Sequence, residues 1–424
     1  MYKRQGEAEP LFVEALGMRR RLFNGDHPDV ANSLDKLAGV RRALGHAAQA
    51  EPLFVEALEM RRRLFRGDHP SVALSMDKLA GVRLALGRAP EAEALYVQAL
   101  EMHQRLFAGD HPDVATSLNN LAFARRALGR APEAEALYIQ ALDMHRRLFV
   151  GDHPDIATGL NNLASVRQDL GRAGQAEPLY VEALEVYRRL FKGDHPLVAM
   201  GLNNLAGVRL GLDRAAEAEP LYIEALEMHR RLFKGDHPDI AAGLNNLAFV
   251  RRAMGRAAEA EPMFIEALEM YRRLFNGDHP NVAMGLSNVA LLRQSMGRQA
   301  DAEPFHLEAL EMRRRLFPGD HLDTATSLSN LARVQQELGR ASEARHGFDE
   351  AVAMLRRLAP NGSAVLARVL WRSGSARLGS GDATGALAEL EEAAAMAAKV
   401  LPPQHPHLTE YDNTLAKCRN ALGK

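Results

Sequence analysis

The chain has 424 residues, of which 47% are hydrophobic and 25% charged, and its formal net charge is −1, which argues against a nucleic-acid binder that acts through bulk charge. Its single cysteine, Cys418, excludes a disulfide framework, so we expect a soluble protein of a reducing, cytoplasmic compartment. No apolar run reaches the ~18–20 residues that cross a membrane.

One segment recurs along almost the whole chain, and residues 231–275 show it best. An unbroken period of this size predicts an array of repeats, in which each unit buries its apolar face against its neighbours. The repeated Gly-Asp-His motif begins every 42 residues, at Gly25, Gly67, Gly109, Gly151, Gly193, Gly235, Gly277 and Gly319.

Each unit reads as two helices. Helix A begins at Pro238, with His237 as its N-cap, because proline is tolerated in a first helical turn. Apolar residues then recur at helical spacing as far as Gly255, which ends the helix. Helix B follows with a second apolar stripe. That stripe consists of Ala260, Phe264, Ala267, Leu268, Tyr271, Leu274 and Phe275.

These positions resemble the tetratricopeptide repeat, with Leu244, a Leu247-Ala248 pair, Gly255 and an Ala260…Phe264…Ala267 series. The 42-residue length, the Asp-His-Pro loop and the Leu-Asn-Asn-Leu-Ala segment are similar to the repeats of kinesin light chains. The resemblance covers essentially the whole chain and implies an all-α, right-handed superhelical solenoid of antiparallel helix pairs. One column departs from the family: helix A carries arginine where tyrosine is usual.

Three regions are expected along the chain. Residues 1–24 form a leading helix B without a helix A, so either the array begins on a half repeat or the chain is a fragment of a longer protein; no secretion leader precedes it. Residues 25–358 form eight repeats, in which Asp213 and Leu322 replace the usual Gly and Pro. Residues 359–424 form a divergent ninth repeat and a capping helix, with a hinge at 360–363.

Several sequence features could be mistaken for a metal, nucleic-acid or catalytic site. The Asp-His pairs suggest metal ligands, but equivalent residues on stacked helices lie about 8–10 Å apart, whereas zinc needs ligands at roughly 2.0–2.2 Å. We therefore expect caps, no metal and no cofactor. Basic runs such as Arg272-Arg273 end helix B, where they complement the helix dipole, and a nucleic-acid patch is the lesser alternative. No phosphate loop or nucleophile motif supports an enzyme.

The face of helix A turned away from the core carries a column of asparagines, which would line the concave side of a solenoid. The amide group offers donors and an acceptor, so the column can hold the backbone of an extended peptide; the alternative is a ladder between helices. In the tetratricopeptide family the matching Asn holds peptide backbone or a terminal carboxylate. The column comprises Asn120, Asn162, Asn204, Asn246, Asn288 and Asn330, with Asn119, Asn161, Asn203 and Asn245 immediately before four of them and Lys36 and Lys78 in the first two repeats.

Further side chains complete the expected site, which is centred on Asn162, Asn204, Asn246 and Asn288. Phe123, Phe249 and Leu291 would provide apolar pockets. Four arginines would favour acidic neighbours: Arg126, Arg209, Arg251 and Arg252. The unusual arginine column either pairs with glutamates of helix B or brings its heads into the groove. This column comprises Arg41, Arg83, Arg125, Arg167, Arg209, Arg251, Arg293, Gln335, Arg377 and Arg419.

The sequence thus predicts a non-enzymatic scaffold that binds an extended, acidic peptide segment of another protein. Two alternatives remain open. The chain could be the sensing or docking arm of a larger signalling ATPase or enzyme, or a solenoid that binds RNA or another polyanion. The partner and the oligomeric state are not specified by any motif.

Overall fold

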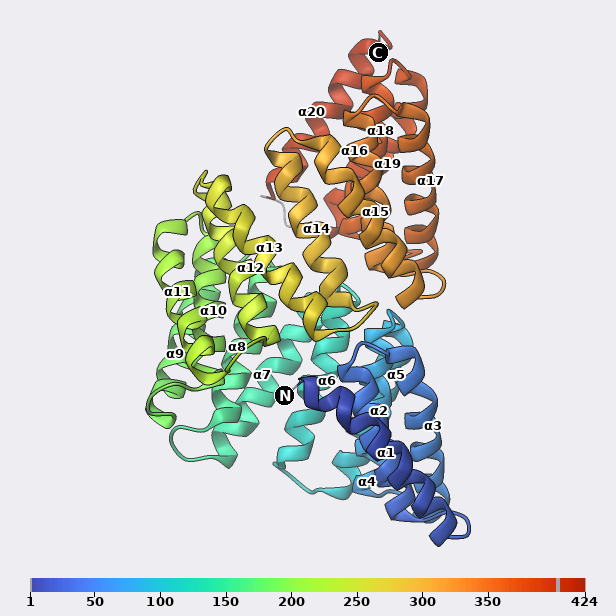
Figure 1. The fold of residues 1–424 in the computed structure, drawn as a ribbon, viewed down its shortest axis with the longest axis vertical. Helices are drawn as coiled ribbons and strands as arrows, with labels where there is room; N and C mark the ends of the chain where they lie inside the picture. Colours follow the sequence, from blue (N-terminus) through green and yellow to red (C-terminus); the bar gives the residue numbers. More distant parts are fainter. Residues whose placement is uncertain (1, 402–404, 424) are drawn as a thin grey trace. The chain divides into compact units, whose positions relative to one another are not determined.

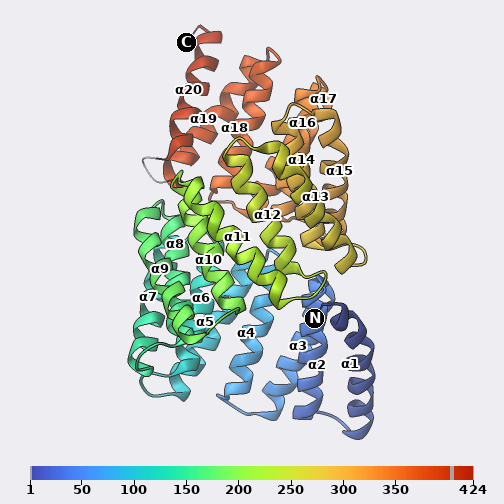
Figure 2. The ribbon, with the colours of Figure 1, turned by 60° about the vertical axis from the view of Figure 1, so that its left-hand side comes forward.

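The computed structural model describes residues 2–401 and 405–423, and every regular element in these ranges is an α-helix. The chain divides into two compact units, Met1–Asn276 and Gly277–Lys424. Consecutive helices pack as antiparallel pairs joined by short turns, and the pairs follow one another in chain order within each unit (Figure 2). This confirms the predicted all-α solenoid of helix pairs. The division at 276/277 falls inside the region of regular repeats, whereas the expected hinge at 360–363 lies within the second unit.

The first unit contains helices α1 to α13. Its helices A are α2 (Pro28–Ala43), α4 (Pro70–Ala85), α6 (Pro112–Ala127), α8 (Pro154–Asp169), α10 (Pro196–Gly211) and α12 (Pro238–Ala253). Its helices B are α1 (Tyr2–Leu22), α3 (Ala47–Leu64), α5 (Ala89–Leu106), α7 (Ala131–Leu148), α9 (Ala173–Leu190), α11 (Ala215–Leu232) and α13 (Ala257–Leu274).

The second unit contains α14 to α20. Its helices A are α14 (Pro280–Ser295), α16 (Leu322–Glu337), α18 (Ala364–Gly379) and α20 (Pro406–Ala421). Its helices B are α15 (Gln299–Leu316), α17 (Ala341–Leu358) and α19 (Ala383–Val400). Among residues 2–401 and 405–423, none of the helices is both long and apolar enough to cross a membrane.

The start of helix A is set by the histidine before it. In α12 the Nδ1 atom of His237 accepts a hydrogen bond from the backbone N–H of Asp239 at 3.2 Å, so the N-cap prediction is confirmed. The His237 ring also stacks on Phe233, with ring centroids 3.6 Å apart. Where Leu322 replaces the usual proline, His321 still caps α16 through the N–H of Asp323 at 3.1 Å.

The turn from helix A to helix B needs a residue in the left-handed backbone conformation, with positive φ. Gly255 has φ +77°, a conformation that glycine adopts without steric cost. Asp213 takes the same position after α10 with φ +59°, where its side chain makes the conformation less favourable. The turn after α10 therefore keeps the backbone conformation of the other turns although Asp213 replaces glycine there.

The core lies between the two helices of each pair and between neighbouring pairs. Leu244 of α12 and Phe264 of α13 are among its fully buried side chains. At Gly243 a Cβ atom would come within 3.0 Å of Leu226 Cδ1 on α11, so glycine allows close approach of the two helices. Successive helices A also contact one another directly, as in α4 with α6, α8 with α10, and α10 with α12. Figure 1 shows α9 and α11 on the outer side of α8 and α10.

Candidate functional site

The asparagine column of the first unit lies half-buried on successive helices A, on α6, α8, α10 and α12. Asn204 donates from Nδ2 to Asn161 Oδ1 at 3.2 Å, and Asn120 hydrogen-bonds to Asp77. Asn162 and Asn246, by contrast, have no side-chain hydrogen bond with any residue in the described part of the chain. The column thus contains members of a ladder between helices as well as amides that have no side-chain hydrogen bond with a described residue.

Two of the four asparagines that directly precede this column are hydrogen-bonded inside the stack. Asn161 is 5% exposed and donates to the hydroxyl of Tyr187 at 3.4 Å. Asn245 is 3% exposed and hydrogen-bonds to Tyr271. Asn119 and Asn203 are half-buried. In the pairs 161/162 and 245/246, the first amide is therefore bonded inside the stack, whereas the second has no side-chain hydrogen bond with a described residue.

The column continues in the second unit, where its members are more enclosed. Asn288 is buried on α14, and Asn330 is buried on α16. The Oδ1 atom of Asn330 accepts a hydrogen bond from Arg372 Nη1 at 3.1 Å. Leu291 of α14 is half-buried.

Aromatic and basic side chains lie one turn further along the same helices. Phe123 of α6 is 53% exposed, which is unusual for a large apolar side chain. Phe249 of α12 is half-buried and packs edge-on against Phe264, with ring centroids 5.0 Å apart. The guanidinium of Arg252 lies 5.4 Å from the Phe249 ring centroid, whereas Arg126 forms two hydrogen bonds with the carboxylate of Asp169.

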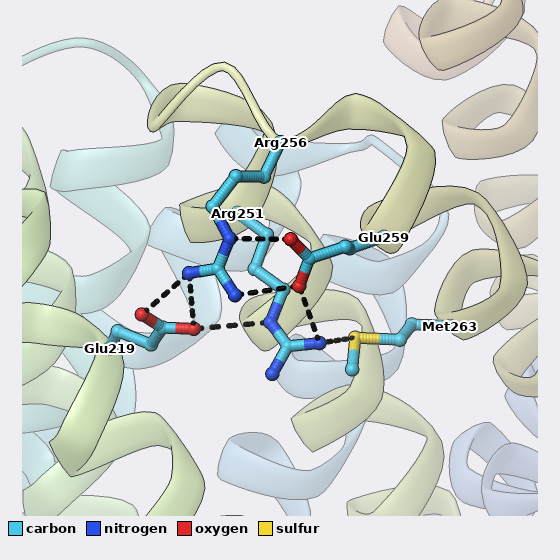
Figure 3. A network of polar contacts seen from close by, with 5 residues as sticks. All are labelled: Glu219, Arg251, Arg256, Glu259 and Met263. Carbon is cyan, nitrogen blue, oxygen red and sulfur yellow. Dashed lines mark hydrogen bonds and ion pairs between the residues drawn. The ribbon is translucent and has the colours of Figure 1, made fainter.

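The unusual arginine column is held in ion pairs at the edge of the core. Figure 3 shows Arg251 Nε donating to Glu219 Oε1 at 3.1 Å, while Arg256 from the following turn donates to the same carboxylate. Glu259 then bridges the two arginines, at 3.6 Å from Arg251 Nη1 and 2.6 Å from Arg256 Nη2. Arg251 and Glu219 side chains are 20% and 16% exposed, so pairing offsets the loss of hydration.

The same pairing recurs through the first unit, which supports the pairing alternative over a groove-facing one. Burial alone would raise the pKa of Glu177, but hydrogen bonds from Arg209 and Arg214 lower it below its usual range. The corresponding column pairs are Arg41–Glu9, Arg83–Glu51, Arg125–Glu93, Arg167–Glu135 and Arg209–Glu177.

The Asp-His loops are also occupied by structural contacts. Asp236 accepts two hydrogen bonds from Arg273 at the end of the next helix B, at 2.7 and 3.0 Å. This hydrogen bonding is the main reason that the pKa of Asp236 is lowered. Asp194 and Arg231 make the equivalent pair. The basic residues at these helix ends are therefore neutralised by the preceding loop. Within residues 2–401 and 405–423, no three His, Cys, Asp or Glu side chains gather as metal ligands would.

Sequence reasoning missed a cluster of arginines in the second unit. Arg372 of α18 occupies the place of the asparagine column, and Arg333 of α16 occupies the place of Phe249. Arg368 lies one turn before Arg372 on the same helix. Carrying the 42-residue register of the inner columns into the divergent tail would have revealed these substitutions.

Comparison with solved structures finds several proteins to which this chain is similar. Similar solved structures include kinesin light chain TPR-like repeats from Podosopora anserina, with 23% identity, coverage of 50% of this chain and 100% of that chain, and a TM-score of 0.42. BtubC (BKLC) from P. vanneervenii has 26% identity, coverage of 54% and 92%, and a TM-score of 0.46. A Rap protein complexed with Competence and Sporulation Factor has 14% identity, coverage of 94% and 99%, and a TM-score of 0.53.

The comparison with curated proteins gave no match. A family model described as tetratricopeptide repeat matches eight overlapping stretches, at residues 2–63, 36–105, 71–147, 113–189, 155–231, 197–248, 239–315 and 283–357. These stretches span most of the sequence and follow the observed helix pairs. The chain therefore belongs to the tetratricopeptide repeat family.

Proposed function

We propose that the protein is a non-enzymatic interaction scaffold that binds an extended, acidic segment of a partner protein along the helices A of residues 1–276. The observation that carries this proposal is the pair Asn162 and Asn246. These equivalent amides lie on α8 and α12 and have no side-chain hydrogen bond with a described residue. A half-buried amide without a protein partner is available to a peptide backbone, which presents both a donor and an acceptor at every non-proline residue.

The neighbouring side chains suit a partner segment with apolar and acidic residues. Phe123 offers an exposed aromatic surface, and a few such contacts usually dominate the affinity of an interface. Arg252 has no carboxylate partner among the residues that the structure describes, and burial lowers its pKa. An acidic side chain of the ligand would supply the missing counter-charge, so binding should weaken as salt increases.

The shared fold of the Rap protein gives further support. That protein was solved in complex with Competence and Sporulation Factor, and its fold is similar to this chain over 94% of the chain's length. A tetratricopeptide array of this kind can thus present a binding surface. The identity of the bound molecule does not transfer between the two proteins, and for this chain the amide and aromatic positions carry the proposal.

The experiment is a peptide-display selection followed by fluorescence-anisotropy titration of the selected peptide. Asn162→Ala combined with Asn246→Ala removes two amides that form no internal bond, so we expect a folded protein. Because each backbone hydrogen bond contributes about 0.5–1.5 kcal/mol, the affinity should fall by about 5- to 100-fold.

The matched control is Gln98→Ala combined with Gln140→Ala, which removes two exposed amides from helices α5 and α7. We expect the control to bind within twofold of the wild type. Equal affinities for the wild type and the Asn162/Asn246 variant, or a larger loss in the control, would place the binding surface elsewhere.

A further inference from the structure

The second unit carries three arginines where the regular repeats have other residues. Arg368 and Arg372 lie four residues apart, so they share one face of α18. Arg333 comes from the neighbouring helix A, α16, which contacts α18 directly. All three side chains are half-buried. In the first unit the corresponding positions of α12 hold Ala242, Asn246 and Phe249.

These guanidinium groups have only neutral hydrogen-bond partners. Arg372 Nη1 donates to Ser329 Oγ at 3.2 Å and to Asn330 Oδ1 at 3.1 Å. Arg333 Nη2 donates to Gln294 Oε1 at 2.6 Å. The Nε atoms of Arg333 and Arg368 are buried without a hydrogen-bond partner in the described part of the chain, and so is the hydroxyl of Ser375 on the same helix as Arg368.

This arrangement disfavours the positively charged forms of the side chains in and around the cluster. Burial, followed by the charges of Arg333 and Arg368, lowers the pKa of Arg372 to about 10. His306 of α15 is 1% exposed, and burial together with the charges of Arg333, Arg313 and Arg372 lowers its pKa to about 4. Its Nε2 atom is also buried without a described partner. Adjacent like charges that share a poorly hydrated site favour the binding of an anion.

Nearby carboxylates do not neutralise this charge. Glu337 accepts a hydrogen bond from Gln294 Nε2 at 2.7 Å, and Glu410 lies 3.1 Å from His407 Nδ1. Glu337 raises the pKa of Arg333, and Glu410 raises that of Arg372, but in each case burial lowers the pKa by more. In the first unit, by contrast, arginines of similar burial such as Arg251 contact a carboxylate directly.

We propose that α16 and α18 form an oxyanion site for a carboxylate or phosphoryl group carried by an acidic protein segment. Arg333, Arg368 and Arg372 would hold the oxygen atoms, with the Ser375 hydroxyl as a further donor. Planar guanidinium groups bind either oxyanion with paired hydrogen bonds. This inference rests on the proposed function, because it names the chemistry that the scaffold recognises in a protein partner. A local cluster, in a chain whose other basic helix ends are largely paired, favours a peptide over a nucleic-acid backbone.

The test is anisotropy titration of the full chain with three fluorescein-labelled peptides: hexaglutamate, hexaglutamine, and a hexapeptide with two central phosphoserines. We expect the two anionic peptides to bind and hexaglutamine to bind at least about tenfold more weakly. Inorganic phosphate should compete with both, and the stronger anionic peptide identifies the preferred oxyanion.

The variant Arg368→Gln with Arg372→Gln should weaken binding of the anionic peptides by at least about tenfold. Its melting temperature should stay the same or rise, because the substitution relieves repulsion between buried charges. The matched control is Arg356→Gln with Arg357→Gln, which removes the same charge from outer ion pairs with Glu392 and Asp320 and should bind normally. If the double variant loses helicity, Arg368→Gln alone decides, because the Arg368 side chain forms no hydrogen bond or ion pair with a residue that the structure describes.

Any of the following results would overturn the site: binding of the Arg368/Arg372 variant within twofold of the wild type, an equal loss in the outer control, or tighter binding of a single-stranded RNA hexamer than of either anionic peptide. Loss of hexaglutamate binding in the Asn162/Asn246 variant but not in the arginine variant would reject the oxyanion site and leave the proposed function standing. Failure of the wild type to bind any anionic probe would reject the site, while the display selection tests the scaffold independently.

Discussion

The two units use one helical framework, but α16 and α18 of the second unit each depart from one of its polar columns. In the first unit Arg251 and its equivalents pair with a glutamate of the preceding helix B. In the second unit Gln335 occupies this column on α16, and Glu303 contacts only Arg340. The asparagine column continues through Asn288 and Asn330 of the second unit and gives way to Arg372 only on α18.

The core columns, in contrast, are shared. Leu244 of α12, Leu286 of α14, Leu328 of α16 and Leu370 of α18 are all buried at equivalent positions. The apolar stripe therefore maintains the stack, while the inner columns vary without disturbing it. This separation is what allows one repeat to carry different binding chemistry in different parts of the chain.

The largest expected effect comes from removing the shared carboxylate of the first unit. Glu219→Gln leaves Arg251 and Arg256 without their common partner, and we expect a loss of about 2–3 kcal/mol, below the range for fully buried pairs because both groups are partly exposed. Glu303→Gln removes a single contact and should cost about 1 kcal/mol. Urea denaturation, with hydrogen exchange resolved over α12 and α16, measures both. Equal losses would contradict the difference between the units.

The second expected effect concerns acid stability of the second unit. Because His306 has an unfolded pKa of 6.5 and a folded pKa of about 4, the unfolded state binds more protons and stability falls as pH decreases from 6.5 toward 4. His306→Phe restores the aromatic residue found at Phe264 and Phe348. Its advantage over the wild type should be about 2 kcal/mol larger at pH 4.5 than at pH 7. Melting curves across this range test it, and a pH-independent difference would refute the assignment to His306.

The first unit should respond to pH in the opposite direction through Asp77. Burial raises its pKa from 3.8 to about 7, despite a hydrogen bond from Asn120. The folded state therefore binds more protons than the unfolded state, and this group makes stability fall as pH rises from about 4 to about 7. Asp77→Asn introduces the residue found one repeat later at Asn119.

We expect Asp77→Asn to match the wild type near pH 4 and to exceed its stability by about 1–2 kcal/mol at pH 8, a shift reduced by partial exposure. Thermal melts of both proteins at the two pH values provide the measurement. A variant that is less stable than the wild type at pH 8 would show that the Asp77 carboxylate has a compensating partner.

The smallest expected effects concern two helix caps that use different residues, His237 before α12 and Ser363 before α18. His237→Ala in the first unit and Ser363→Ala in the second should each cost about 1 kcal/mol or less. Ser363 Oγ accepts from the N–H of Leu366 at 3.1 Å, so its contact is confined to the cap. Chemical denaturation of both variants gives the comparison. A loss of several kcal/mol at His237 would assign this histidine a role beyond capping.

The helix pairs could be predicted almost completely from the sequence. Caps such as His237-Pro238, the turn at Gly255 and the apolar stripe through Phe264 act within one or two turns of the chain, and the 42-residue period repeats the same information. Local residues determine helix starts and ends because the relevant hydrogen bonds join near neighbours. Stacking then follows from the apolar faces, which single units cannot bury alone.

Only the tertiary structure shows which polar side chains have partners within the protein. Asn161 and Asn162 are adjacent in sequence, yet their side chains differ. Asn161 is hydrogen-bonded inside the stack, whereas Asn162 has no side-chain hydrogen bond with a described residue. Arg251 meets Glu219 across 32 residues, and Arg333 joins Arg372 from another helix. The repeat pattern specifies on which face of its helix a residue lies. The partner of a polar side chain, however, depends on the distances between helices. These distances determine whether the side chain supports the fold or remains available to a ligand.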